Sequence, residues 1–304
     1  MNAKFRNLLL GAALAAATFA PSLADTVGPL LFPGDDTVVT RDRFSDEIVG
    51  KGPDIVFIPG LASSRETWKA QAQRLSEHYR VHLIQIAGFA GEPSRANATG
   101  AVLVPAAEAI DAYLREAHLA PATIVGHSLG GTMTLYLAEH HPADLRKAML
   151  VDALPFYSTL MLGPQATVAA ATPMADAARA NPAGILSGPR HDRTMAGMAS
   201  APADRAMIEA WGKATDASVA ANAIADDMTL DLRPGLAAVT TPLTLVFPDY
   251  APAGAPPGTT ATMYRAAYAA VPGMAFVEAK DSLHFVMLDQ PRQFDTALDA
   301  FLEK

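Results

Sequence analysis

The sequence predicts an α/β fold: a mostly parallel, twisted sheet flanked by helices, with an inserted helical lid. Short apolar runs alternate with helix-like patterns up to residue 152, and this alternation resumes after residue 236. Residues 153–236 are instead rich in Ala, Met and Pro, with helical patches and no convincing strand. We therefore expect residues 25–152 and 237–304 to form the core and residues 153–236 to form the lid.

Each element of the core is predicted from its own pattern. Apolar runs that end at Gly, Pro or Asp predict strands, and apolar residues three or four positions apart, such as Trp68, Ala72 and Leu75, predict helices. In chain order we expect strands at 54–58, 81–86, 123–125, 147–151, 243–247 and 274–278, and helices at 65–78, 104–118, 129–140, 261–270 and after residue 291.

The composition describes an ordinary globular protein and excludes several classes of function. Half of the 304 residues are apolar, which is enough for a sizeable core, and the net charge of −8 offers no electropositive surface to nucleic acid. The chain has no cysteine, so disulfides, thiolate catalysis, Cys-based zinc sites and iron–sulfur clusters are excluded together. We therefore expect any catalytic nucleophile or base among Ser, His, Asp and Glu.

Residues 1–24 have the layout of a secretory signal peptide. Lys4 and Arg6 form a positive start, residues 8–20 are apolar, and Ser22-Leu23-Ala24 places small residues at positions −3 and −1 of a cleavage site. The apolar run is shorter than the roughly 20 residues that span a membrane, so we expect cleavage after Ala24 and no stable membrane anchor. The expected location of the mature protein is the periplasm or the medium.

The sharpest functional motif is Gly126-His127-Ser128-Leu129-Gly130-Gly131, which fits the pattern G-x-S-x-G. An expected strand precedes the motif and an expected helix follows it, which is the context of a nucleophile turn. Small neighbours relieve crowding there, and the helix N-terminus directs backbone N–H groups at an oxyanion. We predict that Ser128 is a catalytic nucleophile; the alternative is a tight glycine turn with a capping serine.

His284 is the expected general base for this serine. It follows the last expected strand, on a loop beyond a carboxyl end, where ligand chemistry collects in open α/β sheets. His127 adjoins the nucleophile but is expected to shape the turn rather than to act as the base.

Two aspartates compete to orient the histidine. Asp249 lies just beyond the expected strand at 243–247 and gives the chain order Ser128, Asp249, His284, so we prefer it. Asp152, just beyond the expected strand at 147–151, is the alternative acid. We expect the aspartate that does not serve as the acid to be a strand-end residue that caps the next turn.

Two backbone N–H groups are expected to form an oxyanion hole. Pro59-Gly60-Leu61-Ala62 ends a strand, where glycine lets the backbone turn and present an N–H. We assign the amides of Leu61 and Leu129 as the donors. Losing one such donor typically costs about 3 kcal/mol of transition-state stabilisation.

From about Thr37 onward, the sequence resembles the α/β-hydrolases. The resemblance rests on the glycine-rich turn around Ser128, the loop at Gly60 and the late segment Leu283-His284-Phe285-Val286-Met287. It implies the same roles for Ser128, Asp249, His284 and the two leucine amides, no metal and no organic cofactor, and a lid that shapes the substrate pocket. The serine argues against the family's haloalkane dehalogenases and epoxide hydrolases, which use an aspartate there.

The expected reaction is acyl transfer to water. His284 takes the proton of Ser128 as it attacks a carbonyl, and water then cleaves the acyl-enzyme. The Ala- and Met-rich lid suggests an apolar, adaptable pocket, so the expected partner is a small-molecule substrate, an apolar carboxylic ester with a small to medium acyl chain.

Other hypotheses remain open from the sequence. C–C bond hydrolysis, lactone hydrolysis and cofactor-free haloperoxidation use the same residues. An aminopeptidase would need carboxylates in the lid for the substrate amine, and the close pair there, Asp226-Asp227, is expected on a solvated helix face. A non-catalytic binding protein on the same fold is also permitted. The oligomeric state does not follow from the sequence.

Overall fold

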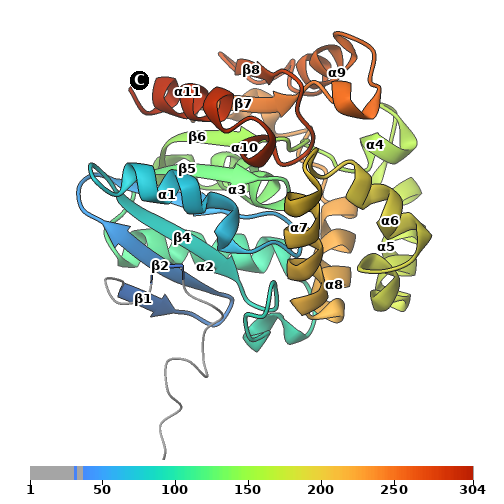
Figure 1. Ribbon diagram of the computed structural model, residues 1–304, viewed down its shortest axis with the longest axis horizontal. Helices are drawn as coiled ribbons and strands as arrows, with labels where there is room; N and C mark the ends of the chain where they lie inside the picture. Colours follow the sequence, from blue (N-terminus) through green and yellow to red (C-terminus); the bar gives the residue numbers. More distant parts are fainter. Residues whose placement is uncertain (1–30, 33–36, 304) are drawn as a thin grey trace, which may run out of the picture.

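One sheet organises the chain (Figure 1), which we describe from a computed structural model for residues 31–32 and 37–303. The expected signal peptide at residues 1–24 lies outside the described residues. Within them, the sheet has eight strands in the order β1-β2-β4-β3-β5-β6-β7-β8. The strands are β1 (Thr37–Thr40), β2 (Phe44–Gly50), β3 (Asp54–Ile58), β4 (Arg80–Ile86), β5 (Ala122–His127), β6 (Leu145–Val151), β7 (Leu243–Pro248) and β8 (Ala275–Ala279).

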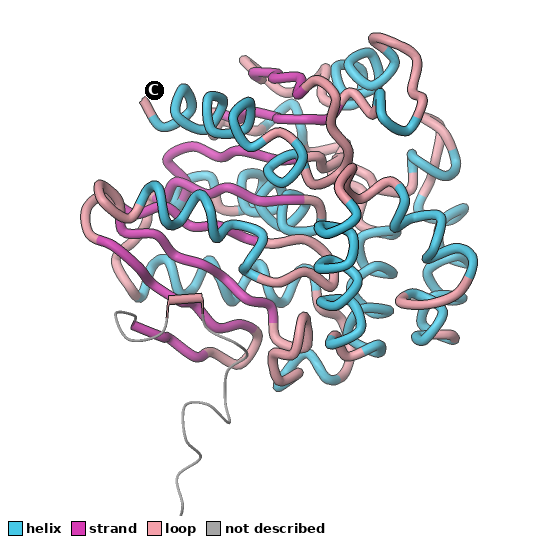
Figure 2. The backbone as a smooth tube through the Cα atoms, in the orientation of Figure 1, coloured by secondary structure: helices cyan, strands magenta, loops and turns pink. Residues whose placement is uncertain are grey.

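The strands from β4 to β8 run parallel, and β1 and β2 add an antiparallel edge. The register pairs Ile58 with Gly126 and Gly126 with Leu150, so β3, β5 and β6 end at nearly the same level. Loops that follow these strands therefore meet at one edge of the sheet (Figure 2). The predicted α/β fold with a mostly parallel sheet is confirmed.

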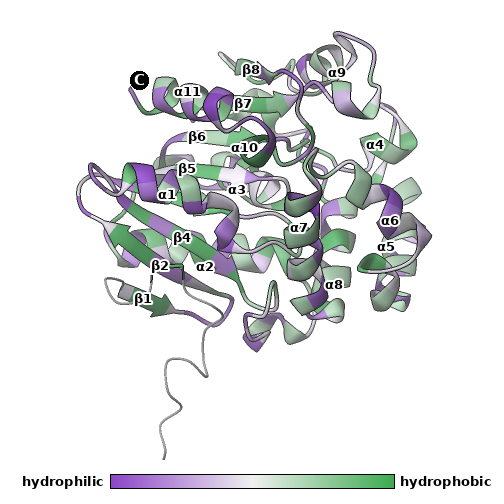
Figure 3. Cartoon of the chain, in the orientation of Figure 1, coloured by the Kyte–Doolittle hydropathy of each residue, from purple (hydrophilic) through white to green (hydrophobic). Residues whose placement is uncertain are grey.

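Helices cover both faces of the sheet because parallel strands need crossover connections. Within β3, Val56 and Ile58 face one core, and Ile55 and Phe57 face the other. Strand β7 is drawn largely in the hydrophobic colour (Figure 3), as expected for a strand buried on both sides, whereas in β4 this colour is interrupted by polar residues. The core helices are α1 (Lys69–Leu75), α2 (Leu103–Glu116), α3 (Leu129–His140), α9 (Thr259–Ala267), α10 (Val286–Asp289) and α11 (Pro291–Leu302).

The two antiparallel strands β1 and β2 are missing from the sequence prediction, and the burial of polar residues explains why β2 is missing. Its residues Ser45, Asp46 and Glu47 are fully buried, so the strand shows neither an apolar run nor an apolar–polar alternation. These polar groups are paired instead: the Glu47 carboxylate lies 3.3 Å from the Arg65 guanidinium, and Asp46 lies 2.6 Å from His82 Nδ1. A strand that buries paired charges has no signature in local hydrophobicity.

The segment between β6 and β7 is a helical insertion. It contains α4 (Thr159–Leu162), α5 (Val168–Ala180), α6 (Pro189–Ala196), α7 (Pro202–Ala214) and α8 (Ala217–Thr229). Figure 1 shows α5 to α8 gathered at one end of the sheet. Residues of α5 and α8 share a small apolar cluster against which Leu61, from the loop after β3, also packs. None of the described helices is both long and apolar enough to span a membrane.

We predict that Arg65→Ala lowers the free energy of unfolding by about 3–5 kcal/mol, because it leaves the buried carboxylate of Glu47 without its partner. Denaturant unfolding of the mature protein measures this loss. The control is Arg74→Ala, which removes an exposed ion pair with Asp299 and should cost no more than about 1 kcal/mol. Equal losses in the two variants would show that the buried pair does not support the edge of the sheet.

Candidate active site

Ser128 occupies the turn between β5 and α3 in a strained backbone conformation, with φ 52° and ψ −120°. Its N–H donates to the carbonyl of Val151 at 2.9 Å, and its carbonyl accepts from the N–H of Thr132 at 2.9 Å. The turn is therefore fixed both to the end of β6 and to the first turn of α3. The serine is half-buried and lines a cavity at the carboxyl edge of the sheet.

Two glycines make this turn possible. A Cβ on Gly126 would lie 2.2 Å from the carbonyl oxygen of Gly130, and a Cβ on Gly130 would lie 2.5 Å from the carbonyl oxygen of Ile58. Any side chain at either position would collide with backbone atoms that have no freedom to move. The strand, the turn and the helix thus pack against the end of β3 only because both residues lack a Cβ.

The structure pairs His284 with Asp152. The Nδ1 atom of His284 lies 2.5 Å from the carboxylate of Asp152, which is almost completely buried just beyond β6. With Nδ1 engaged, Nε2 is the ring nitrogen left for a reacting group. Ser128, Asp152 and His284 line one cavity of about 130 Å³.

The preference for Asp249 as the partner of His284 is wrong in this geometry. The carboxylate of Asp249 accepts hydrogen bonds from the N–H groups of Ala251, at 3.0 Å, and Ser282, at 3.3 Å. Burial alone would raise the pKa of Asp249, but these backbone donors outweigh burial and lower it. Asp249 thus caps the turn that follows it, the role expected of the aspartate that is not the acid.

Two tyrosines that the sequence analysis missed complete the surroundings of Asp152. The hydroxyl groups of Tyr250, at 2.6 Å, and Tyr264 both donate to its carboxylate. Burial alone would raise the pKa of Asp152, but His284 and the two hydroxyls outweigh it, so the pKa is lowered and the carboxylate stays ionised. Burial and the neighbouring carboxylate raise the pKa of each tyrosine well above its usual value, which keeps both hydroxyls as donors.

His127 holds the backbone of His284 in place. The His127 ring is fully buried, and its Nε2 lies 3.1 Å from the carbonyl oxygen of His284. Burial, together with the neighbouring His284, lowers the pKa of His127 to about 3, so the ring is neutral and Nε2–H donates. The N–H of His284 in turn donates to the carbonyl of Gly197 in the helical insertion, at 3.2 Å.

The two expected oxyanion donors belong to the two segments next to the serine, the start of α3 and the loop after β3. Leu129 is the first residue of α3, where N–H groups have no partner within the helix. Leu61 follows Gly60, and a Cβ on Gly60 would lie 3.1 Å from the Cβ of Ser128, so this loop packs directly against the nucleophile turn. The loop after β3 is also held by Gln85, whose side-chain amide donates to the carbonyl of Ser63 at 3.1 Å.

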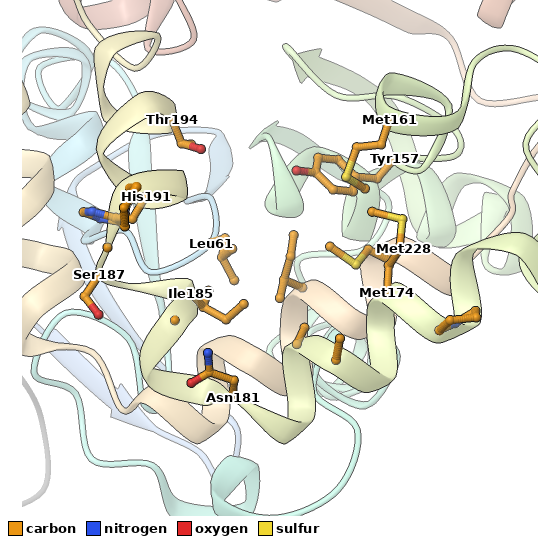
Figure 4. A pocket seen from close by; sticks show the side chains of 17 residues that line it. Leu61, Tyr157, Met161, Met174, Asn181, Ile185, Ser187, His191, Thr194 and Met228 are labelled. Carbon is orange, nitrogen blue, oxygen red and sulfur yellow. The ribbon is translucent and has the colours of Figure 1, made fainter.

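A larger apolar cleft of about 980 Å³ opens between this loop and the helical insertion. Figure 4 shows Met161, Met174, Met228 and Ile185 gathered around it, together with Leu61 and Tyr157. Leu61 links this cleft to the expected oxyanion loop, and Tyr157 lines both the cleft and the small cavity at Ser128. The cleft therefore adjoins the serine and offers an adaptable apolar surface.

The expectation that Asp226 and Asp227 lie on a solvated helix face is wrong. Asp226 accepts hydrogen bonds from the N–H groups of Val102, at 2.6 Å, and Leu103, so it caps α2. Asp227 is 5% exposed and lines the small cavity together with Ser128 and His284. The sequence gives no sign of this because an acidic pair in an Ala-rich helix looks like an ordinary solvated face.

One cluster outside the site brings together possible metal ligands. Among the described residues, ligand atoms of Glu108, Asp111 and His141 lie within 4.8 Å of one another. These groups already pair: His141 Nε2 lies 3.0 Å from Glu108, and the guanidinium of Arg115 lies 2.7 Å from Asp111. We interpret the cluster as an ion-pair network between α2 and the segment after α3.

A glycine-lined strand–turn–helix with a strained serine, beside a histidine held by a buried aspartate, defines the class of α/β hydrolases. Comparison with known families agrees: residues 55–297 match the Alpha/beta hydrolase family, and the chain belongs to it.

Individual relatives are distant. The chain is 31% identical over 113 residues to the pimeloyl-[acyl-carrier protein] methyl ester esterase of Aeromonas salmonicida, an alignment that covers 37% of this chain and 42% of the esterase. The chain thus matches less than half the length of this curated relative.

Solved structures support the fold over a longer stretch. An esterase from Exiguobacterium antarcticum matches with a TM-score of 0.70 at 20% identity, covering 86% of this chain and 96% of that one. The enol-lactonase from Burkholderia xenovorans LB400 matches with a TM-score of 0.68, also at 20% identity and with the same two coverages. Similarity at this level establishes the shared fold.

We predict that His127 makes the protein less stable as the pH falls. Between the ordinary histidine pKa near 6.5 and its folded-state pKa of about 3, the unfolded chain binds a proton that the folded protein does not. Stability therefore decreases with falling pH, and between pH 7 and pH 5 the wild type should lose about 2 kcal/mol more than His127→Asn. Urea unfolding at both pH values measures the difference; equal losses would contradict a buried neutral His127.

Proposed function

We propose that this protein is a serine hydrolase that cleaves carboxylic esters, with Ser128 as nucleophile, His284 as base and Asp152 as acid. One observation carries the proposal: the strained Ser128 and His284, the latter bonded to a buried carboxylate, line a single cavity. A glycine turn with a merely capping serine would need neither a histidine beside it nor a buried ionised partner for that histidine.

The proposed reaction proceeds in two halves. His284 Nε2 takes the proton of the Ser128 hydroxyl as its oxygen attacks the ester carbonyl, and Asp152 stabilises the imidazolium that forms. The amides of Leu61 and Leu129 bind the oxyanion, which collapses as His284 gives its proton to the departing alcohol. Water, deprotonated by His284, then attacks the acyl-enzyme and releases the acid and the free serine.

The substrate class is proposed from the shape and lining of the site. Met, Ile, Leu and Ala make up eight of the 17 residues that line the cleft of about 980 Å³, so it suits the apolar part of an ester with a small to medium acyl chain. The partial similarity to a methyl ester esterase favours an ester over the other bond classes that the same residues cleave. The proposed substrate is thus a small apolar ester rather than a macromolecule.

We predict that the mature protein hydrolyses p-nitrophenyl esters, tested from acetate to palmitate. Ser128→Ala should lower kcat by about 10⁴- to 10⁶-fold, because it removes the nucleophile. Asp152→Asn should lower kcat by about 10⁴-fold, because an amide supports the wrong histidine tautomer. Asp249→Asn is the matched control and should stay within about threefold of the wild type, since Asp249 caps a turn.

The outcomes separate the alternatives. Loss of activity in Asp249→Asn but not in Asp152→Asn would overturn the assignment of the acid. Labelling of Ser128 by a fluorophosphonate without cleavage of any ester would indicate a different bond class. If the protein neither cleaves an ester nor is labelled, the non-catalytic binding hypothesis replaces the enzyme.

We also propose that the protein acts in the periplasm or is secreted, after cleavage behind Ala24. The positive start, apolar run and small residues of positions 1–24 support this. We predict that the chain expressed in a Gram-negative host appears in the osmotic-shock fraction or the medium and that its N-terminal sequence begins at Asp25. An intact N-terminus in the cytosolic fraction would overturn the proposal.

A further inference from the structure

Asp227 reaches the active-site cavity from the helical insertion and has no part in the mechanism above. It lies on α8, is 5% exposed, and lines the cavity together with Ser128 and His284. A carboxyl group at this depth contributes little to solubility and is costly to bury, so its position beside the nucleophile calls for a partner.

The carboxyl group is only half satisfied. Thr132, one helical turn after Ser128, hydrogen-bonds to it, but among the described residues its Oδ1 atom is buried with no hydrogen-bond partner. Polar atoms buried in native structures almost always have a partner, and exceptions in a binding cavity indicate a group that a ligand completes. The carboxyl group, which lines the cavity, therefore lacks one partner, a place that a hydrogen-bond donor on the substrate fills.

The surroundings favour an uncharged donor. The groups that act on the charge of Asp227 are its neighbour Asp226, which opposes ionisation, and the Thr132 hydroxyl. Burial raises the pKa of Asp227 to about 7, so near neutral pH much of this group is a carboxylic acid that can donate as well as accept. A hydroxyl group matches both roles, whereas an ammonium group would require burying an ion pair beside apolar side chains.

The size of the cavity limits which part of the substrate it takes. Its volume of about 130 Å³ is roughly the share of four water molecules in the liquid. Its other lining includes Leu154, Leu160 and Met263. A short arm of the ester with one polar group fits here, while a longer apolar arm fits the cleft lined by the methionines.

We propose that Asp227 is a specificity-determining residue that hydrogen-bonds a hydroxyl group on the short arm of the substrate. The preferred substrates are then hydroxylated esters: hydroxyacyl esters, or esters of a short diol, with an apolar group on the other arm. This inference rests on the proposed ester hydrolysis and refines its substrate class.

The test compares matched esters that differ by one hydroxyl group. Ethyl 3-hydroxybutyrate and ethyl butyrate place the difference on the acyl arm; 3-hydroxypropyl butyrate and propyl butyrate place it on the alcohol arm. In at least one pair, wild-type kcat/KM should favour the hydroxylated ester by about tenfold or more, because a site that hydrogen-bonds a hydroxyl rejects the analogue without it. Asp227→Leu should reduce this ratio to within about twofold of one, and Asp227→Asn should retain part of it.

Glu209→Gln is the control in the helical insertion, since Glu209 is an exposed partner of Lys213 on α7, and it should leave the ratio unchanged. If Asp227→Leu does not fold, Asp227→Ala replaces it in the same measurement, with the same expected loss of preference. If Asp227 is purely structural, its substitution lowers kcat/KM equally for both esters of a pair, and that result overturns the inference. A stronger wild-type preference for ethyl 3-aminobutyrate than for ethyl 3-hydroxybutyrate would also overturn it. Cleavage of the plain esters without any hydroxyl preference refutes the inference alone, whereas no cleavage of any ester refutes the proposed function.

Discussion

The site depends on one constraint, the positive φ of Ser128 in a turn with no room for side chains. The turn places the serine at the start of α3, above β5, and brings α3 so close to the end of β3 that only glycine fits at Gly130. The same proximity sets the loop of Leu61 beside the serine. A backbone held in this way keeps the Ser128 hydroxyl and the expected oxyanion donors in fixed relation.

Backbone strain of this kind recurs along the carboxyl edge of the sheet. A non-glycine residue with positive φ follows each of β3, β5, β6, β7 and β8, namely Ala62, Ser128, Asp152, Tyr250 and Asp281. Each such residue costs free energy that the packed core must offset. The core supplies it through strands buried on both faces, and three of these residues, Ser128, Asp152 and Tyr250, line the small cavity at the site. The stability of the packed sheet thus offsets the backbone strain of the loops at its carboxyl edge.

Much of this arrangement could be predicted because its signals are local. The glycines around Ser128 indicate the turn directly, because a position without room for a Cβ can be occupied only by glycine. The six expected strands were visible as short runs of apolar residues. His284 could be found because a polar residue just past a parallel strand lies at the edge where sites form.

The rest could not be predicted because its causes lie far apart in the sequence. Asp152 and Asp249 both follow parallel strands, and only the three-dimensional packing of Tyr250 and Tyr264 around Asp152 distinguishes them. Strand β2 escaped notice because Arg65, which pairs with its buried Glu47, comes from another element. Asp227 resembled a solvated residue because the residues with which it lines the cavity, among them Ser128 and His284, lie far from it in the sequence.

These long-range contacts also show that the helical insertion is part of the site. Its backbone fixes the loop of the histidine twice, through hydrogen bonds from the N–H of His284 to Gly197 and from the N–H of Phe285 to Met198. Asp152 holds the ring of His284 while Gly197 and His127 hold its backbone. A displacement of the segment between α6 and α7 would therefore shift the histidine relative to Ser128. The insertion that lines the apolar cleft thereby helps to set the position of His284, so the cleft and the geometry at Ser128 are mechanically linked.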